Sequence, residues 1–442
     1  MRLSSWLLIA VLSATARGGA ATRPRYGGTL RVEMRAAPAA LDPAAADAGP
    51  LRSLVYETLV RLDDAGVPQP CLALSWQHDA AVRRWQFNLR PAVKLHDGAP
   101  LTAAAVAPSL QAALPAATVA ATGDTTLTIR ANHPLPGLLL DLAHNGWLDT
   151  GPFRSTAFEP ARRAAFAANE DYWGGRPFLD AIEVQLGRGL RDQLADLELG
   201  KADVVEIAPA DLRRASGGGR EIWSSADINL IALAFAPAPG SGDASRLREA
   251  LALSIDRAAM HTVLLQRQGE VSAALLPQWI SGYAFAFPTT PDLPRARALL
   301  SAVPPAARTL TLAYDPSLRA ARSLAERIAV NARDAGLAVQ VSVQNPRADV
   351  RLMEIRLASL DPAQALGEVA AALDLQAPEA SAAPAALYES ERQLLDGFRV
   401  IPLFQLPVLY GAASRVRVYA PPPVTRLGDW RFDNLWLSGT AP

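Results

Sequence analysis

Hydrophobic and polar positions alternate strictly over residues 84–90, a pattern that is typical of a strand with one buried face. Trp85, Phe87 and Leu89 fall on the apolar side, and polar residues stand between them. Residues 125–131 alternate in the same way and predict a second strand of the same small sheet.

A turn and a short helix are predicted directly after the first of these strands. His96-Asp97-Gly98 is the polar turn, since glycine adopts a positive φ without steric cost. Thr102 then stands at a suitable position to cap an Ala-rich helix through its side-chain oxygen.

An α/β organisation is predicted for the rest of the chain. Apolar residues at steps of three and four predict amphipathic helices over residues 51–62, 190–197, 244–266, 319–335 and 387–396. Alternating or continuous apolar runs predict strands over residues 29–34, 204–207, 229–235 and 338–343. Helices that alternate with strands are typical of α/β lobes.

Length, charge and cysteine content exclude several classes of protein. A chain of 442 residues is too long for one hydrophobic core and predicts two or three domains. Its 43 basic and 43 acidic residues balance, which argues against a nucleic-acid partner. The single cysteine, Cys71, excludes an internal disulfide and is predicted to be a buried small hydrophobe.

The N-terminus is typical of a secretory signal peptide, expected over residues 1–21. Arg2 is followed by an apolar run and by Ala14-Thr15-Ala16, a small-x-small cleavage site. No later apolar run predicts a transmembrane helix, and no cysteine stands near the cleavage site for lipid attachment. We therefore expect a soluble periplasmic protein that is not a lipoprotein.

No catalytic, metal or cofactor site is predicted from motifs. The five histidines are scattered, and no two have the i,i+4 spacing of a helical zinc site. A G-x-S-x-G motif and a C-x-x-C motif are both absent. A hydrolase would require a Ser/His/Asp cluster assembled by the fold, and that alternative stays open.

Residues 84–106 read RWQFNLRPAVKLHDGAPLTAAAV. They resemble a signature of the extracytoplasmic solute-binding proteins of ABC importers, the peptide/nickel-binding family (family 5). That signature is W-x-F-x-L-R-P/G-x-V-K-F/L-H-D-G followed by P-L-T-A-x-D-V, and Ala105 stands where the family has Asp. Residues 169–182, NEDYWGGRPFLDAI, also resemble a family motif, as does the Ile-Pro-Leu of residues 401–403.

The resemblance implies a two-lobed α/β fold of the periplasmic-binding-protein type, with an extra small domain in the first lobe. The first lobe would comprise residues 22–45, 150–232 and 405–442, with a subdomain inserted at 46–149. The second lobe would comprise residues 233–404, with a shortened connection near 362–386. The chain would cross between lobes near Leu233 and Phe404.

A ligand site between the lobes is also implied. By resemblance, its contacts come from the loop before residue 51, the segment before Gly151, the loop after the long helix, and the stretch that ends at Asp361-Pro362. The residues predicted to line it are Asp47, Asn145, Trp147, Trp279, Tyr283, Glu354, Asp361 and Phe404.

Peptide-binding members of the family hold the peptide's ammonium with an Asp, and Ala358 stands at that position here. Glu354 or Asp361 would have to replace it, because a buried ammonium without a partner costs several kcal/mol. The expected function is the periplasmic component of an ABC importer, a monomer without a cofactor that delivers a short peptide or another small organic solute to a membrane permease. One alternative is a degenerate sensor or interaction protein without transport, and the other is a periplasmic hydrolase.

Overall fold

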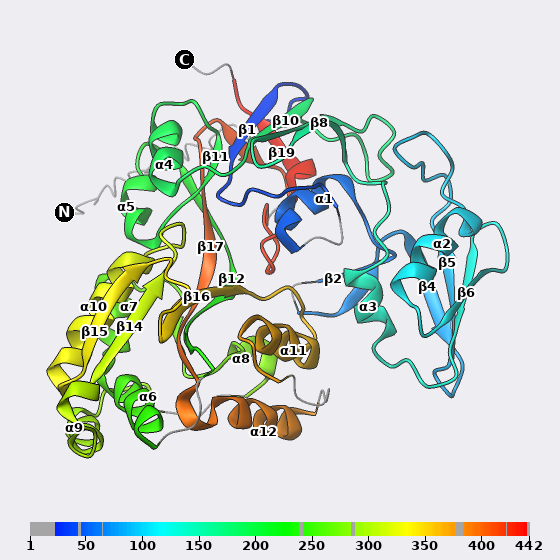
Figure 1. Ribbon diagram of the computed structural model, residues 1–442. Coiled ribbons are helices and arrows are strands. Elements are labelled where there is room, and N and C mark those ends of the chain that lie inside the picture. Colours follow the sequence, from blue (N-terminus) through cyan, green and yellow to red (C-terminus); the bar gives the residue numbers. More distant parts are fainter. Residues whose placement is uncertain are drawn as a thin grey trace, which may run out of the picture.

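The computed structural model describes residues 23–42, 46–63, 65–237, 242–283, 288–376, 383–420 and 422–439, except for the side chains of residues 46–48 (Figure 1). The expected signal peptide, residues 1–21, lies outside the described residues.

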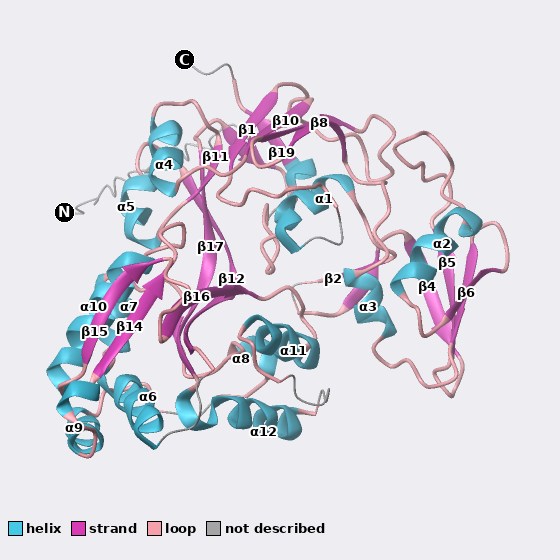
Figure 2. Ribbon diagram, in the orientation of Figure 1, coloured by secondary structure: helices cyan, strands magenta, loops and turns pink. Residues whose placement is uncertain are grey.

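Eleven strands of the described chain form one large mixed sheet that runs through both lobes (Figure 2). In spatial order they are β15 (Ala338–Val343), β14 (Thr309–Tyr314), β16 (Val350–Arg356), β12 (Glu221–Phe235), β17 (Val400–Ala412), β11 (Val204–Glu206), β1 (Thr29–Glu33), β10 (Ala181–Gln185), β9 (Arg163–Ala168) and β8 (Phe153–Glu159), with β13 (Glu270–Val271) on β17. The predicted α/β class is confirmed.

Two long antiparallel strands, β12 and β17, connect the two halves of this sheet. Their pairing runs from Glu221 opposite Ala412 to Ala234 opposite Val400, with irregular register around Asp227. Every residue of β17 is buried, which explains its continuous apolar sequence. Strand β12 begins earlier than the predicted Asn229, because its polar first half pairs with β17 as well.

The second lobe packs four helices on its part of the sheet: α6 (Gly242–Ser254), α7 (Arg257–Val263), α9 (Leu293–Ser301) and α10 (Ala321–Ala335). The single helix predicted over residues 244–266 is wrong. Asp256 divides it, because its carboxylate caps α7 by accepting from Ala259 N at 2.9 Å.

Three further helices of the second half pack near one another and share a buried cluster that continues into the first lobe: α8 (Gln278–Ser281), α11 (Pro362–Ala372) and α12 (Pro384–Leu395). Leu366 and Leu387 belong to the same buried cluster as Leu30 and Phe153. Helix α11 occupies part of the segment that the sequence indicated as a shortened connection, so the alanine-rich run there is helical.

The inserted subdomain is a four-stranded sheet covered by helices. Its strands, in spatial order, are β4 (Ala73–His78), β5 (Arg84–Leu89), β7 (Thr126–Arg130) and β6 (Thr118–Ala121). Helices α2 (Ala103–Ala113) and α3 (Leu138–His144) accompany them, and Thr102 Oγ1 caps α2 through Ala105 N at 3.2 Å. The predicted strands, turn and cap are confirmed.

The helix predicted over residues 51–62 is wrong in most of its length. A 3₁₀ turn, η1 (Ala46–Leu51), leads into the single turn of α1 (Arg52–Val55), after which the chain extends into β2 (Val60–Leu62), paired with β3 (Pro68–Pro70). The apolar periodicity arises here because the short helix buries Leu54, and the chain that enters the strand buries Leu59 and Val60.

The remaining elements complete the first lobe and its connections. They are α4 (Leu190–Glu198), α5 (Leu212–Ala215), β18 (Val416–Val418), β19 (Leu435–Leu437), η2 (Pro209–Asp211), η3 (Pro305–Ala307), η4 (Asp396–Phe398) and η5 (Phe432–Asn434). Trp430 and Phe432 stack with ring centroids 4.7 Å apart inside the first-lobe core.

Glu57 joins the subdomain to the first lobe. Its buried carboxylate accepts hydrogen bonds from Thr150 Oγ1 at 2.8 Å, Tyr172 Oη at 2.9 Å and Trp173 Nε1 at 2.7 Å. Burial raises the pKa of Glu57, although these three donors oppose the shift. The Tyr-Trp motif is therefore structural. Cys71 lies beside it, buried, and burial raises its thiol pKa to about 12.

Candidate functional site

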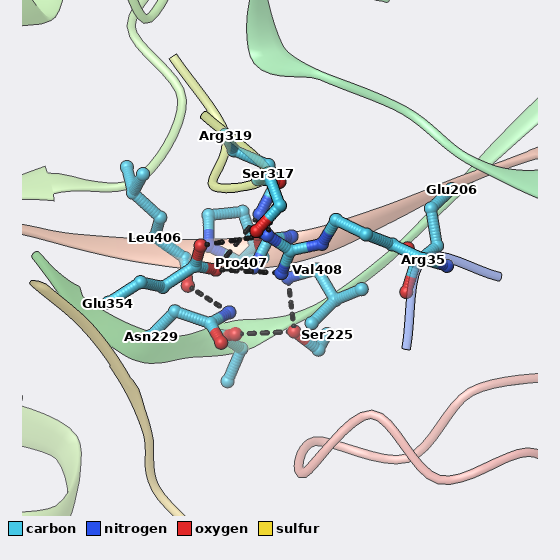
Figure 3. Close-up of polar contacts among 11 residues, drawn as sticks. Arg35, Glu206, Ser225, Asn229, Ser317, Arg319, Glu354, Leu406, Pro407 and Val408 are labelled. Carbon is cyan, nitrogen blue, oxygen red and sulfur yellow. Dashed lines mark hydrogen bonds and ion pairs between the residues drawn. The ribbon is translucent and has the colours of Figure 1, made fainter. Parts of the chain in front are cut away.

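The candidate site is built around the place where β12 and β17 pass from one lobe to the other. Glu354 on β16 lies there with its side chain almost fully buried, between Arg319 of the second lobe and Arg35 of the first (Figure 3). Arg35 Nη1 is 3.3 Å from Glu354 Oε2 and donates to Ser317 O at 3.0 Å. Arg319 Nε donates to Glu354 Oε1 at 3.0 Å, and its Nη2 donates to the same oxygen.

The charge of Glu354 is therefore compensated inside the protein. Burial alone would raise the pKa of this carboxyl, but the positive charges and hydrogen bonds of Arg319 and Arg35 lower it to about 2. The same contact raises the pKa of Arg319 against the opposing effect of its burial. The sequence predicted Glu354 as a partner for a ligand's ammonium, and the structure gives it two guanidinium partners instead.

Two side chains of β12 form hydrogen bonds with the backbone of β17 where the register of this strand pair is irregular. Ser225 Oγ accepts from Val408 N at 2.8 Å, and Asn229 Nδ2 donates to Leu406 O at 3.1 Å (Figure 3). Between them stands Pro407, which has no N–H to give to the ladder. A short segment that is held by side chains rather than by a regular ladder is a suitable place for hinge bending.

Two arginines lie over the tryptophans that were predicted to line the ligand site. Arg426, in the C-terminal segment of the first lobe, lies 4.2 Å from the centroid of Trp279 on α8. Arg52, at the start of α1, lies 5.2 Å from the centroid of Trp147, whose Nε1 donates to His144 O at 2.8 Å. Both tryptophans keep part of their surface exposed.

Tyr283 is held by a buried carboxylate. Its Oη donates to Glu391 Oε2 at 2.6 Å, and its ring packs edge-on against Tyr388 at 5.3 Å. Glu391 also accepts from the backbone N–H groups of Leu275 and Leu276, and burial raises its pKa. The tyrosine ring is partly exposed, whereas its hydroxyl already donates its hydrogen bond to Glu391.

The other predicted residues have structural roles or lie outside the description. Asn145 is exposed at the end of α3, where Nδ2 donates to Asp141 O at 3.2 Å. Asp361 caps α11 by accepting from Gln364 N at 2.8 Å. Phe404 has no exposed surface and lies in the second-lobe core. Asp47 lies in η1, and its side chain is outside the described residues.

Two of the predicted residues have arginine partners that sequence reasoning missed. Arg35 and Arg319 pair with Glu354, and Arg426 lies over Trp279. One signal was available: Arg35 stands just beyond the C-terminal end of β1, where open α/β sheets bind ligands. No local sequence pattern indicated Arg319 or Arg426.

Histidine contacts bear on the hydrolase alternative. Each of the five histidines has a ring nitrogen within hydrogen-bond distance of a backbone carbonyl. In the described part of the chain, no hydrogen bond joins a histidine to a serine hydroxyl, and no group of three or more His, Cys, Asp or Glu residues is arranged to hold a metal ion. Nor is any described helix both long and apolar enough to cross a membrane.

Sequence comparison adds a family match. The profile of the bacterial extracellular solute-binding proteins, family 5 (middle region), matches residues 67–138 and 141–381. The nickel-binding periplasmic protein of Escherichia coli is 25% identical over 249 residues, which cover 47% of this chain and 48% of that protein. A probable D,D-dipeptide-binding periplasmic protein of the same species is 23% identical over 283 residues, 55% of this chain and 54% of that protein. The chain thus spans about half the length of these curated relatives.

Solved structures confirm the two-lobed fold. NikZ from Campylobacter jejuni, in complex with Ni(L-His), is similar with a TM-score of 0.80 and 17% identity over 92% of this chain and 99% of that chain. The oligopeptide-binding protein AppA from Bacillus subtilis, in complex with a nonapeptide, gives a TM-score of 0.74 with 15% identity over 94% of this chain and 100% of that chain. At these identities the likeness establishes the fold.

Proposed function

The chain belongs to the bacterial extracellular solute-binding proteins of family 5, and from this premise we propose that it is the substrate-binding component of an ABC importer. The family consists of solute-binding proteins rather than enzymes. In the proposed function, residues 1–21 direct export, the two lobes close on a solute, and the closed protein delivers it to a membrane permease.

The observation that carries the proposal is the way the lobes are joined. Strands β12 and β17 run through both lobes, and their pairing is irregular at the same level as the Arg35–Glu354 contact. A continuous connection with one irregular segment permits rotation without loss of either core. A ligand that binds better to the closed arrangement shifts the population toward it, and a permease can recognise that form.

A short peptide or another small organic solute is the proposed ligand class. Relatives in the comparison are described as binding nickel or D,D-dipeptides, and AppA was solved with a nonapeptide. In this chain Trp147, Trp279 and Tyr283 keep exposed surface and are the proposed stacking contacts. Because two arginines already compensate Glu354, we do not assign it to a peptide ammonium.

The test is native mass spectrometry of the mature protein isolated from its own periplasm. We expect a co-purified small molecule, whose mass identifies its class and whose addition to stripped protein raises the melting temperature. Protein that is ligand-free, and that a peptide and sugar library leaves unshifted, would contradict the importer function and favour the sensor alternative.

A further inference from the structure

A partly enclosed cavity lies in the second lobe, away from the junction between the lobes. Its volume is about 230 Å³, and it separates α6 and α9 from the end of α12 and the beginning of β17. Apolar groups line most of it, among them Ala252, Leu253, Val400 and Ile401. An apolar pocket with a few polar groups is the usual form of a small-molecule site.

One of the polar groups at this cavity is a buried cation. Arg257, the first residue of α7, has only 4% of its surface exposed and lines the cavity. Its Nε donates to Pro402 O at 3.1 Å, and among the described residues it makes no ion pair. Burial lowers the pKa of Arg257 to about 10, so the guanidinium is still charged at neutral pH. A buried charge without a counter-charge is unfavourable, and a bound anion would remove that cost.

The surroundings add positive charge rather than neutralising it. Arg295 and Glu249 also line the cavity and pair with each other at 2.5 Å. Arg248 and Arg399 come next in sequence to lining residues, and within the described chain neither makes an ion pair. The Nε atoms of both are buried without a hydrogen-bond acceptor there. Burial and the charge of Arg399 together lower the pKa of Arg248.

We propose that this cavity binds a small organic carboxylate with an apolar body, its carboxylate on Arg257 and its hydrocarbon part against the α6 and β17 side chains. A guanidinium presents parallel N–H groups that fit the two oxygens of a carboxylate. The apolar walls disfavour a bare inorganic anion, which would lose its hydration without replacement. The site is independent of the proposed ligand between the lobes.

The experiment uses straight-chain carboxylates as probes on the mature protein: butyrate, hexanoate and octanoate, each beside the alcohol of equal length, and inorganic phosphate. Calorimetric titration and thermal shift are expected to show binding that strengthens with chain length for the carboxylates alone. Equal effects of acids and alcohols, binding of phosphate in preference to the acids, or no binding at millimolar concentration would overturn the proposal.

Two variants test whether the carboxylates bind in this cavity. Arg257→Met removes the charge and is expected to weaken octanoate binding by at least about tenfold. Ala252→Phe fills the cavity from α6 and is expected to abolish octanoate binding. This variant tests the proposal even if Arg257→Met does not fold. Arg246→Met is the matched control for Arg257→Met. Arg246 is exposed on α6, the helix of Ala252, and pairs with Asp243 at 3.0 Å. Octanoate binding that survives Ala252→Phe would place the ligand elsewhere and overturn the assignment.

Discussion

Glu354 shows how a single buried charge can depend on residues from two lobes. Its pKa of about 2 lies below the ordinary value of 4.5, so its charge contributes stability above pH 4.5 that is lost as the pH falls toward 2. We expect Glu354→Gln to reduce the free energy of unfolding by about 3–5 kcal/mol at neutral pH, because two guanidinium groups lose their counter-charge. Urea unfolding should show this difference from the wild type shrinking at about pH 3.

Glu326→Gln is the control for that experiment. Glu326 forms an exposed pair with Arg322 at 2.8 Å on α10, one turn apart. Its loss should cost much less stability, because water screens an exposed pair. Similar losses for the two variants would show that Glu354 is not stabilised by its partners.

Sequence patterns could not reveal this cluster. Glu354 was visible as an acidic residue in the stretch that ends at Asp361-Pro362, but its partner Arg35 is 319 positions away in the sequence. Arg319 is the first residue of the helix predicted over residues 319–335, where an arginine is ordinarily solvent-exposed. Pairing over such separations is decided by the packing of the sheet and cannot be read from local periodicity.

At the level of elements, α11 offers a direct test of what Asp361 does. The carboxylate accepts the Gln364 N–H and so satisfies one free donor of the first turn. Asp361→Ala should therefore cost about 1 kcal/mol of stability, whereas Asp361→Asn should cost little, since asparagine caps equally well. Chemical denaturation of both variants measures the difference.

The same pair of variants separates capping from ligand binding. If Asp361 instead holds a ligand's ammonium, Asp361→Asn would lose affinity while keeping its stability. Equal stability of the alanine and asparagine variants would contradict the capping role.

The elements that sequence predicted well are those whose signals are local. The alternation in β5, the Thr102 cap and the end of the helix predicted over residues 319–335, where Gly336 has a φ of 95°, need only a few neighbouring residues. The predictions over residues 51–62 and 244–266 failed because tertiary packing broke a continuous apolar period. At Asp256 the backbone N–H turns to Asn331 Oδ1 at 3.3 Å, a contact that no local pattern contains.

At the scale of the whole molecule, the sheet itself is the connection between the lobes. A hinge made from two paired strands resists twisting more than separate loops would, so the contacts beside it decide how far the lobes open. Arg35 is one such contact, because it reaches from the end of β1 to both Glu354 and Ser317 of the second lobe. Its side chain is about one-quarter exposed, so its bonds can break without exposing a core.

Arg35→Ala is therefore expected to favour the open arrangement while both lobes stay folded. Arg319 still compensates Glu354 in this variant, and the lost bonds involve a charged donor, worth about 1.5–3 kcal/mol. That range corresponds to about a tenfold to hundredfold shift in the ratio of open to closed protein. Small-angle scattering should show a larger radius of gyration than for the wild type, and Arg322→Ala, which alters an exposed arginine on α10, should leave it unchanged. An unaltered radius in Arg35→Ala would mean that the lobes are held by the strands alone, and that Arg35 has no part in closure.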